Sequence, residues 1–272
     1  RPGLQCREST DACAAPDSCP DGSPCGIVGE SFECTWFGCA GRPLLDDEHA
    51  PIFAPLCARD DWSAEPGADP IERLSAPQRD ALADHWERCA LGEHASVASF
   101  ARFALDLLAL GAPAELLERT SSAMADEIEH ARLCFGVARR FRGHARGPGP
   151  LPVHATASAS GRRQILAGLI DEACIAETLA VAEAAAALEA SRDPVVRETL
   201  RAIVKDETAH SALAWATLRW AYTNADGDER AWIATTLLRA AREQFQVAAR
   251  EAARPAGSRA LRPWGLLDPA EL

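Results

Sequence analysis

The sequence predicts an all-α protein built on a four-helix bundle, with a fifth helix at its C-terminal end. Three observations support this fold class. Ala- and Leu-rich stretches carry apolar residues every three or four positions, two of these stretches share a repeated motif, and capping or turn residues separate them. Apolar residues at that spacing lie on one face of a helix, and four such faces bury one another in a bundle.

The first helix is expected from about residue 76 to residue 110, and its start is well marked. Ser75 can cap this helix, and Gln78 completes a capping box with Ser75. A Gly-Ala-Pro turn at 111–113 then ends the first helix and begins a second one, expected at about 113–142.

Residues 143–159 are rich in Gly and Pro and predict an extended linker. These 17 residues reach at most about 56–61 Å, whereas a helix of about 30 residues is about 45 Å long. The linker can therefore run the length of the bundle as a long crossover between two helical hairpins. Further helices are expected at about 160–190, 193–223 and 228–253.

Two stretches repeat each other, Asp126-Glu127-Ile128-Glu129-His130 and Asp206-Glu207-Thr208-Ala209-His210. Each contains Asp-Glu-x-x-His, which places the Glu and the His on one face of a helix. Glu93 and Glu177 precede the motif glutamates by 34 and 30 residues, and each has Val at +4 and Ala at +5. The chain therefore reads as two related hairpins, each with an upstream Glu in its apolar stripe.

Four inward carboxylates in an apolar bundle repel one another, and each costs several kcal/mol to desolvate if unpaired. Two divalent cations would neutralise them, and two neutral imidazoles would complete the ligand set. A single Glu-x-x-His is commonly a solvated helix face, but two copies with matched upstream glutamates favour a site for two metal ions. Carboxylate and imidazole together favour iron, manganese or a mixed iron–manganese pair, without excluding zinc.

At these residues the chain resembles the ferritin-like di-iron carboxylate superfamily, with its pattern Glu … Glu-x-x-His … Glu … Glu-x-x-His. The resemblance covers about residues 90–215, extending at most to about 250, and does not include the Cys-rich start. It implies that each metal takes one Glu-x-x-His pair and one further Glu, with one or two bridging carboxylates. It also implies that Asp126 and Asp206 each bind the ring nitrogen of the ligand His on the facing helix. The implied metal ligands are Glu93, Glu127, His130, Glu177, Glu207 and His210.

The chain departs from this family in one respect and leaves one ligand position contested. Glu129 and Ala209 stand where the oxygenase form of the motif has Arg, so no particular oxygenase subfamily is indicated. Glu172 competes with Glu177, but matching the distances from each glutamate to its hairpin turn favours Glu177. Glu172 remains a candidate for an additional or mobile ligand.

The chain is expected to have three parts: a Cys-rich extension (1–73), a helical bundle (74–254) and a tail expected to be extended (255–272). Its ten cysteines are unevenly placed among them. The extension is rich in Pro, Gly, Asp and Ser and cannot build a core of its own, so disulfides are expected to support it. Disulfides imply an oxidising compartment. A structural zinc site is the alternative, but the close Cys-x2-Cys pairs of zinc modules are absent. Seven cysteines lie in the extension: Cys6, Cys13, Cys19, Cys25, Cys34, Cys39 and Cys57.

The remaining cysteines, Cys89, Cys134 and Cys174, lie within the predicted helices. Each is one turn from a proposed ligand and can be a small apolar filler. Since the first two helices are antiparallel, Cys89 and Cys134 are displaced toward the same end, and a disulfide between them is a second hypothesis. His85 is expected at the surface.

The net charge of −12 argues against nucleic acid and against an anionic membrane surface as partners. No run of about 18 apolar residues occurs, so no transmembrane helix is expected. The sequence begins at Arg1 without Met, which fits a leader already removed. We therefore expect an exported protein, periplasmic, cell-surface or extracellular, with an upstream lipid anchor left open.

The leading functional hypothesis is a di-iron or iron–manganese oxidoreductase that binds O2 or peroxide and oxidises a substrate. One alternative is iron handling, by ferroxidase activity, storage or metal binding without an organic substrate, which a cage-like oligomer would favour. Another is a structural envelope protein with an inactive bundle. Substrate and oligomeric state are not encoded in any motif.

Overall fold

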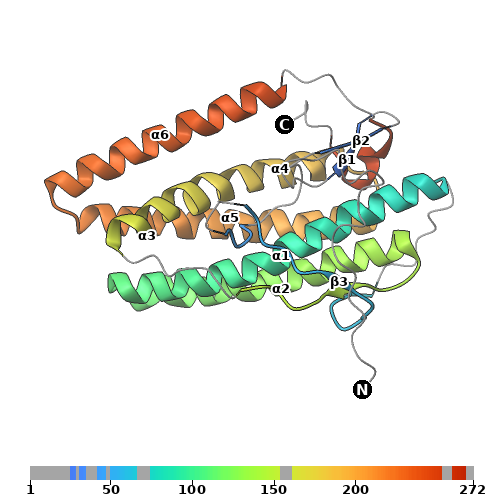
Figure 1. The fold of residues 1–272 in the computed structure, drawn as a ribbon, viewed down its shortest axis with the longest axis horizontal. Coiled ribbons are helices and arrows are strands. Elements are labelled where there is room, and N and C mark those ends of the chain that lie inside the picture. Colours follow the sequence, from blue (N-terminus) through green and yellow to red (C-terminus); the bar gives the residue numbers. More distant parts are fainter. Residues whose placement is uncertain are drawn as a thin grey trace.

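The computed structural model describes residues 25–28, 31–34, 42–46, 50–65, 74–153, 161–252 and 259–267. These residues are mostly helical, and long helices pack side by side in a bundle-like arrangement (Figure 1). The prediction of a mostly helical chain is confirmed. Among the described helices, none combines the length and the apolar content needed to cross a membrane.

Two helical hairpins form the body of the molecule. In the first, α1 (Ala76–Leu110) packs along α2 (Ala114–Arg142), and in the second, α4 (Ala176–Ala190) packs against α5 (Pro194–Thr223). The two hairpins meet where α2 contacts α5. Helix α6 (Gly227–Ala252) then runs along the outside of the second hairpin (Figure 1).

The helix expected at 160–190 is interrupted in its middle. It consists of α3 (Arg162–Gly168), a π-helical segment η2 (Leu169–Ile175) and α4. Single π-helical turns inside α-helices are uncommon and often lie at functional sites. Here the π-helical segment ends two residues before Glu177.

Capping residues determine where the helices begin and end. Ser75 and Gln78 form the predicted capping box at the start of α1, with the Ser75 side chain accepting from the Gln78 N–H. Gly111 ends α1 with φ of 68°, a left-handed conformation that favours glycine. Asp193 caps α5 by accepting from the N–H groups of Val195 and Val196.

The core is divided into two apolar clusters. Along α1, residues up to Leu91 belong to the first cluster and residues from Phe100 onward to the second. On α5, Ile203 belongs to the first cluster and Leu213 to the second. The predicted site residues on both helices lie in the interval between the clusters, so apolar packing surrounds them at both ends.

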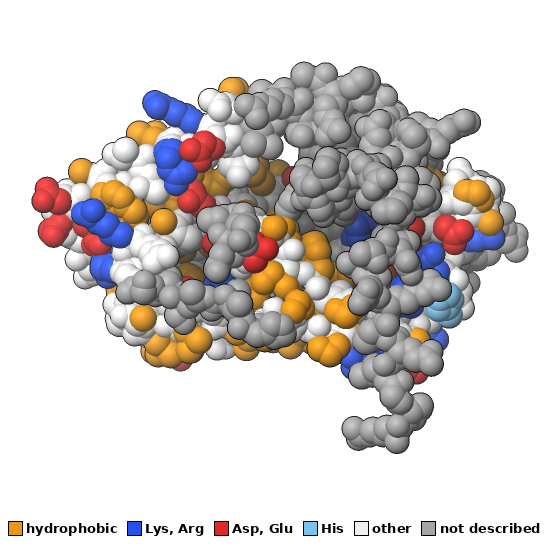
Figure 2. Space-filling model, viewed as in Figure 1, with side chains coloured by type: hydrophobic (Ala, Val, Ile, Leu, Met, Phe, Trp, Pro, Cys, Tyr) orange, Lys and Arg blue, Asp and Glu red, His pale blue; other side chains and the backbone are white. Residues whose placement is uncertain are grey.

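The segments outside the helices include short strands. β1 (Cys25–Val28) pairs with β2 (Ser31–Cys34), and β3 (Leu56–Cys57) pairs with β4 (Gly147–Pro148) in the linker that follows α2. Leu44 and Ala54 are buried, so part of the sequence before α1 packs onto the helices. On the face drawn in Figure 2, acidic and basic side chains of the described residues are interspersed.

The C-terminal residues differ from the expected extended tail. Residues 259–264 form a 3-10 helix, η3 (Arg259–Trp264), and Leu261 is buried. The Trp86 indole N–H donates to the carbonyl oxygen of Trp264 at 3.2 Å, which attaches this segment to α1. Burial of apolar side chains therefore gives the segment a regular conformation that its sequence alone does not predict.

Two predictions about individual residues are wrong. Cys134 is a free thiol, whereas Cys89 is disulfide-bonded, so they do not form a disulfide with each other. His85 is only 5% exposed and packs edge-to-face on Trp86, so it is not a surface residue. Helical spacing locates a side chain on a face of its own helix, but it does not show which neighbouring segment covers that face.

Candidate metal centre

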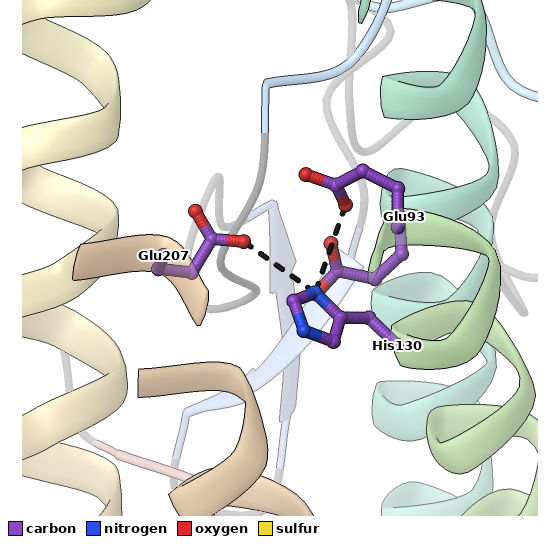
Figure 3. A group of neighbouring side chains, drawn as sticks. Glu93, His130 and Glu207 are labelled. Carbon is purple, nitrogen blue, oxygen red and sulfur yellow. Dashed lines mark ion pairs between the residues drawn. The ribbon is translucent and has the colours of Figure 1, made fainter. Parts of the chain in front are cut away.

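The six predicted ligands come from four helices and converge in the interior of the molecule. Glu93 lies on α1, Glu127 and His130 on α2, Glu177 on α4, and Glu207 and His210 on α5. None of the six is more than 2% exposed. Figure 3 shows Glu93, His130 and Glu207 pointing toward one another from three of these helices.

The ligand atoms fall into two overlapping groups, and within each group they all lie within 4.8 Å of one another. One group contains Glu93, Glu127, His130 and Glu207, and the other contains Glu177, Glu207 and His210. Because Glu207 belongs to both groups, the two groups are adjacent. This geometry suits two neighbouring metal ions that share at least one carboxylate.

The two motif glutamates lie between the two imidazoles. The His130 Nδ1 is 3.8 Å from Glu127 Oε2 and 3.6 Å from Glu207 Oε1. The His210 Nδ1 is 3.3 Å from Glu127 Oε1 and 3.6 Å from Glu207 Oε2. Each of these glutamates thus presents one oxygen to each histidine, which is the placement that a bridging carboxylate requires.

The two motif aspartates contact the outer nitrogens of the histidines across the helix interface. His130 Nε2 is 3.3 Å from Asp206 Oδ2, and His210 Nε2 is 3.2 Å from Asp126 Oδ2. When Nε2–H donates to a carboxylate, Nδ1 keeps its lone pair and points inward. This contact is the common way in which proteins orient a metal-binding imidazole and increase its basicity.

The inward atoms of the six residues have no hydrogen-bond partners. Both carboxylate oxygens of each of the four glutamates, and the Nδ1 atom of each of the two histidines, are buried and unsatisfied. Buried polar atoms are nearly always hydrogen-bonded in native proteins. Ten such atoms directed into one small space fit a donor set for divalent cations, and the charge of four carboxylates matches two of them.

The electrostatics of the metal-free cluster are unbalanced. Burial raises the pKa of Glu93 well above its usual range, and Glu127 and Glu207 raise it further. Burial and Glu207 likewise raise the pKa of Glu177. Burial opposes ionisation of Glu127 too, but the two adjacent imidazoles outweigh it and lower its pKa to about 2. Two imidazoles therefore stabilise the charge of only part of the carboxylate set.

The carboxylates of the cluster act on His210, whereas Glu172 lies outside the cluster. Burial lowers the pKa of His210, but Glu127 and Glu207 more than compensate and raise it to about 11. Glu172 is not part of either group, and its carboxylate instead accepts from Arg102 at 3.0 Å. Glu177, and not Glu172, therefore occupies the ligand position on this part of the chain.

Sequence reasoning did not identify Arg42, which comes from the segment before α1. Its Nε donates to Ser99 Oγ at 3.1 Å and lies 3.9 Å from Glu177 Oε1. Its guanidinium also stacks over the rings of Phe100 and Phe103, at 4.6 and 4.9 Å from their centroids. No repeat or spacing connects Arg42 with Glu177, so no signal in the sequence reveals this contact.

The described residues thus define a helical protein with a buried carboxylate–histidine cluster that can hold metal ions. No protein-family model, curated protein or solved structure matches this chain. The function of the chain is therefore inferred from the chemistry of the site itself.

Proposed function

We propose that this chain is an exported, ferritin-like di-metal carboxylate protein that acts as an oxidoreductase on O2 or peroxide, with iron or an iron–manganese pair as its metals. The observation that carries the proposal is the set of ten buried, unsatisfied atoms directed into one space. The proposed ligands are Glu93, Glu127, His130, Glu177, Glu207 and His210.

Each group of side chains has a distinct role in this proposal. Glu127 and Glu207 would be shared by the two metal ions, since each reaches both histidines. Asp126 and Asp206 hold the imidazoles in the orientation and tautomer that leave Nδ1 free. The apolar clusters on either side keep bulk water away from the site. When bound, the two metal ions supply redox and Lewis-acid chemistry.

A cavity next to the cluster favours an enzyme over iron storage. It has a volume of about 220 Å³ and is bordered by Arg42, which contacts Glu177, and by Glu172 of the π-helical segment. Iron handling uses no organic substrate, whereas an oxidoreductase needs space beside the metal site for the molecule that it oxidises.

The first test is metal content. Elemental analysis of the purified protein, after anaerobic reconstitution with Fe(II), should give about two metal ions per chain, which is the number that four carboxylates neutralise. The double variant Glu127→Ala/Glu207→Ala should hold almost none. Glu129→Ala is the matched control, because Glu129 lies on the same helix but is exposed and paired with Arg132.

The same samples separate the alternatives. Oxidation of Fe(II) by O2, followed by an optical spectrum and a search for substrate-dependent O2 consumption, tests the enzyme hypothesis. Accumulation of many iron ions per chain in a cage-like oligomer would favour iron storage instead. Failure of the reconstituted wild type to retain metal would refute the di-metal proposal and leave a structural bundle.

A further inference from the structure

The cavity beside the cluster is lined by polar side chains of both signs. Arg42 and Arg102 provide positive charge, and Asp106, Asp171 and Glu172 provide negative charge. Arg102 pairs with Glu172 at 3.0 Å, and Asp171 pairs with Arg239 at 3.1 Å, so much of this charge is compensated. A space of about 220 Å³ with mixed charge does not select strongly for either a cation or an anion.

Arg42 is the residue that separates this cavity from the cluster. It lines the cavity, and the same side chain reaches to 3.9 Å from Glu177. It is only 5% exposed, although it comes from a segment outside the helices. The rings of Phe100 and Phe103 lie beneath its guanidinium, and Phe100 also packs edge-to-face against His210 at 5.2 Å. The same side chain therefore borders both the cavity and the second ligand group.

Arg42 is not fixed by a bidentate ion pair to any described residue. Among the residues that the structure describes, its guanidinium makes one hydrogen bond, to Ser99, and one ion pair that is long for a buried contact, to Glu177. The remaining contacts are stacking on aromatic rings, which constrain a planar group less tightly than a bidentate ion pair does.

We propose that Arg42 closes the metal centre toward this cavity, and that the cavity is the entry path for a small uncharged molecule such as O2 or hydrogen peroxide. The identity of the molecule rests on the proposed function, whereas the closing role of Arg42 is a property of the metal-free protein as well. The segment before α1 thereby contributes directly to the site, in addition to covering the helices.

A free thiol offers a readout that does not depend on metal. Cys174 is fully buried and belongs to the same apolar cluster as Phe100 and Phe103. Cys134, the other free thiol among the described cysteines, is also fully buried but belongs to the opposite apolar cluster. Both thiols are labelled with a small methanethiosulfonate, and the rate of labelling is measured by mass spectrometry. The rate at Cys174 reports access from the cavity, and the rate at Cys134 reports general loosening of the fold.

In the metal-free protein, Arg42→Ala should label Cys174 at least about tenfold faster than wild type, with Cys134 unchanged. Burial raises the pKa of the Cys174 thiol to about 12, and Arg42 partly opposes that rise. Removing Arg42 therefore makes the thiol less reactive on chemical grounds, so faster labelling reports access. Arg59→Ala is the control, since Arg59 also precedes α1 but donates a hydrogen bond to the carbonyl oxygen of Pro148, away from the cluster.

Equal labelling of Cys174 in wild type and Arg42→Ala would overturn the closing role, and so would equal acceleration at both thiols. If Arg42→Ala does not fold, Arg42→Gln, which is shorter and keeps a donor for Ser99, replaces it. A metal-loaded sample adds a second readout, because a chelator should remove metal faster from Arg42→Ala than from Arg59→Ala. If the reconstituted wild type retains no metal, the proposed function is refuted. The labelling of the metal-free protein would still test whether Arg42 closes the cluster toward the cavity.

Discussion

Two buried glutamates on α1 provide a direct test of whether the cluster is built for metal. Glu93 and Glu87 are 0% and 2% exposed, yet their surroundings are opposite. Glu93 has two unsatisfied oxygens. Glu87 accepts from Arg142 at 3.1 and 3.3 Å and from Arg146 at 2.9 Å. Replacing each by Leu therefore removes an unpaired carboxylate in one case and a paired one in the other.

We expect Glu93→Leu to raise the unfolding free energy of the metal-free protein by about 1–3 kcal/mol, the usual cost of an unsatisfied buried polar group. Glu87→Leu should lower it by about 2–3 kcal/mol, because Arg146 loses its carboxylate partner and Arg142 keeps, among the described residues, only Asp80 and Asp84. This is below the full value for a buried pair, since both arginines are partly exposed. The two substitutions are chemically identical, so the opposite signs isolate the effect of pairing.

The effect of Glu93→Leu should depend on pH. The pKa of Glu93 is raised in the folded state above its ordinary value of 4.5. A carboxyl group whose pKa is higher in the folded than in the unfolded state stabilises the folded state at a pH below its unfolded pKa. That contribution to the free energy of unfolding is lost as the pH rises toward the folded pKa. The metal-free wild type should therefore lose stability above about pH 4.5 relative to Glu93→Leu, so the gain should be larger at pH 8 than at pH 5.

Urea unfolding in the presence of a chelator, followed by circular dichroism at both pH values, measures these differences. A folded Glu93→Leu protein that is less stable than wild type at pH 8 would refute the reasoning, because Glu93 would then have a stabilising partner without metal. In metal-loaded samples the order should reverse, since the wild type alone gains the full free energy of binding.

Two further predictions concern residues next to the cluster and far from it. Asp126→Asn and Asp206→Asn should each weaken metal affinity by about 10–100-fold, as loss of an imidazole-orienting carboxylate typically does. Competition with a chromogenic chelator measures the affinity. An unchanged affinity would contradict the role of these contacts. Burial lowers the pKa of His85 from 6.5 to about 3. Between these two pH values the imidazole is protonated in the unfolded chain but not in the folded one, so the free energy of unfolding should fall as the pH drops below 6.5. His85→Leu should reduce that acid sensitivity in urea unfolding; an unaltered pH profile would show that other groups cause it.

Much of the helical framework could be predicted because its signals are local. The capping box of Ser75 and Gln78, the turn at 111–113 and the three-to-four spacing of apolar residues each depend on neighbours within a few positions. The repeated Asp-Glu-x-x-His motif is equally local, since helical geometry alone places its Glu and His on one face. For this reason α1, α2 and α5 were predictable to within a few residues, whereas the third predicted helix is interrupted by η2 before α4 begins.

The contacts between distant segments could not be predicted in the same way. Arg42 reaches Glu177, η3 packs onto Trp86, and His85 is covered, each through chain segments that have no periodic pattern. The π-helical segment before Glu177 also leaves no mark in the spacing of apolar residues. Such features depend on which surfaces remain to be covered once the helices have packed.

The sequence by itself determined where the long helices form and on which helix faces the carboxylates and imidazoles of the repeated motif lie, because backbone hydrogen bonding and apolar periodicity operate over one or two turns. Only the tertiary structure decided that Glu127 and Glu207 lie between both histidines and that Asp126 and Asp206 reach across the helix interface. The approach of Arg42 to Glu177 was also decided there. The physical reason is that close packing of α2 against α5, and of the segment before α1 against both hairpins, brings together atoms that no local rule relates.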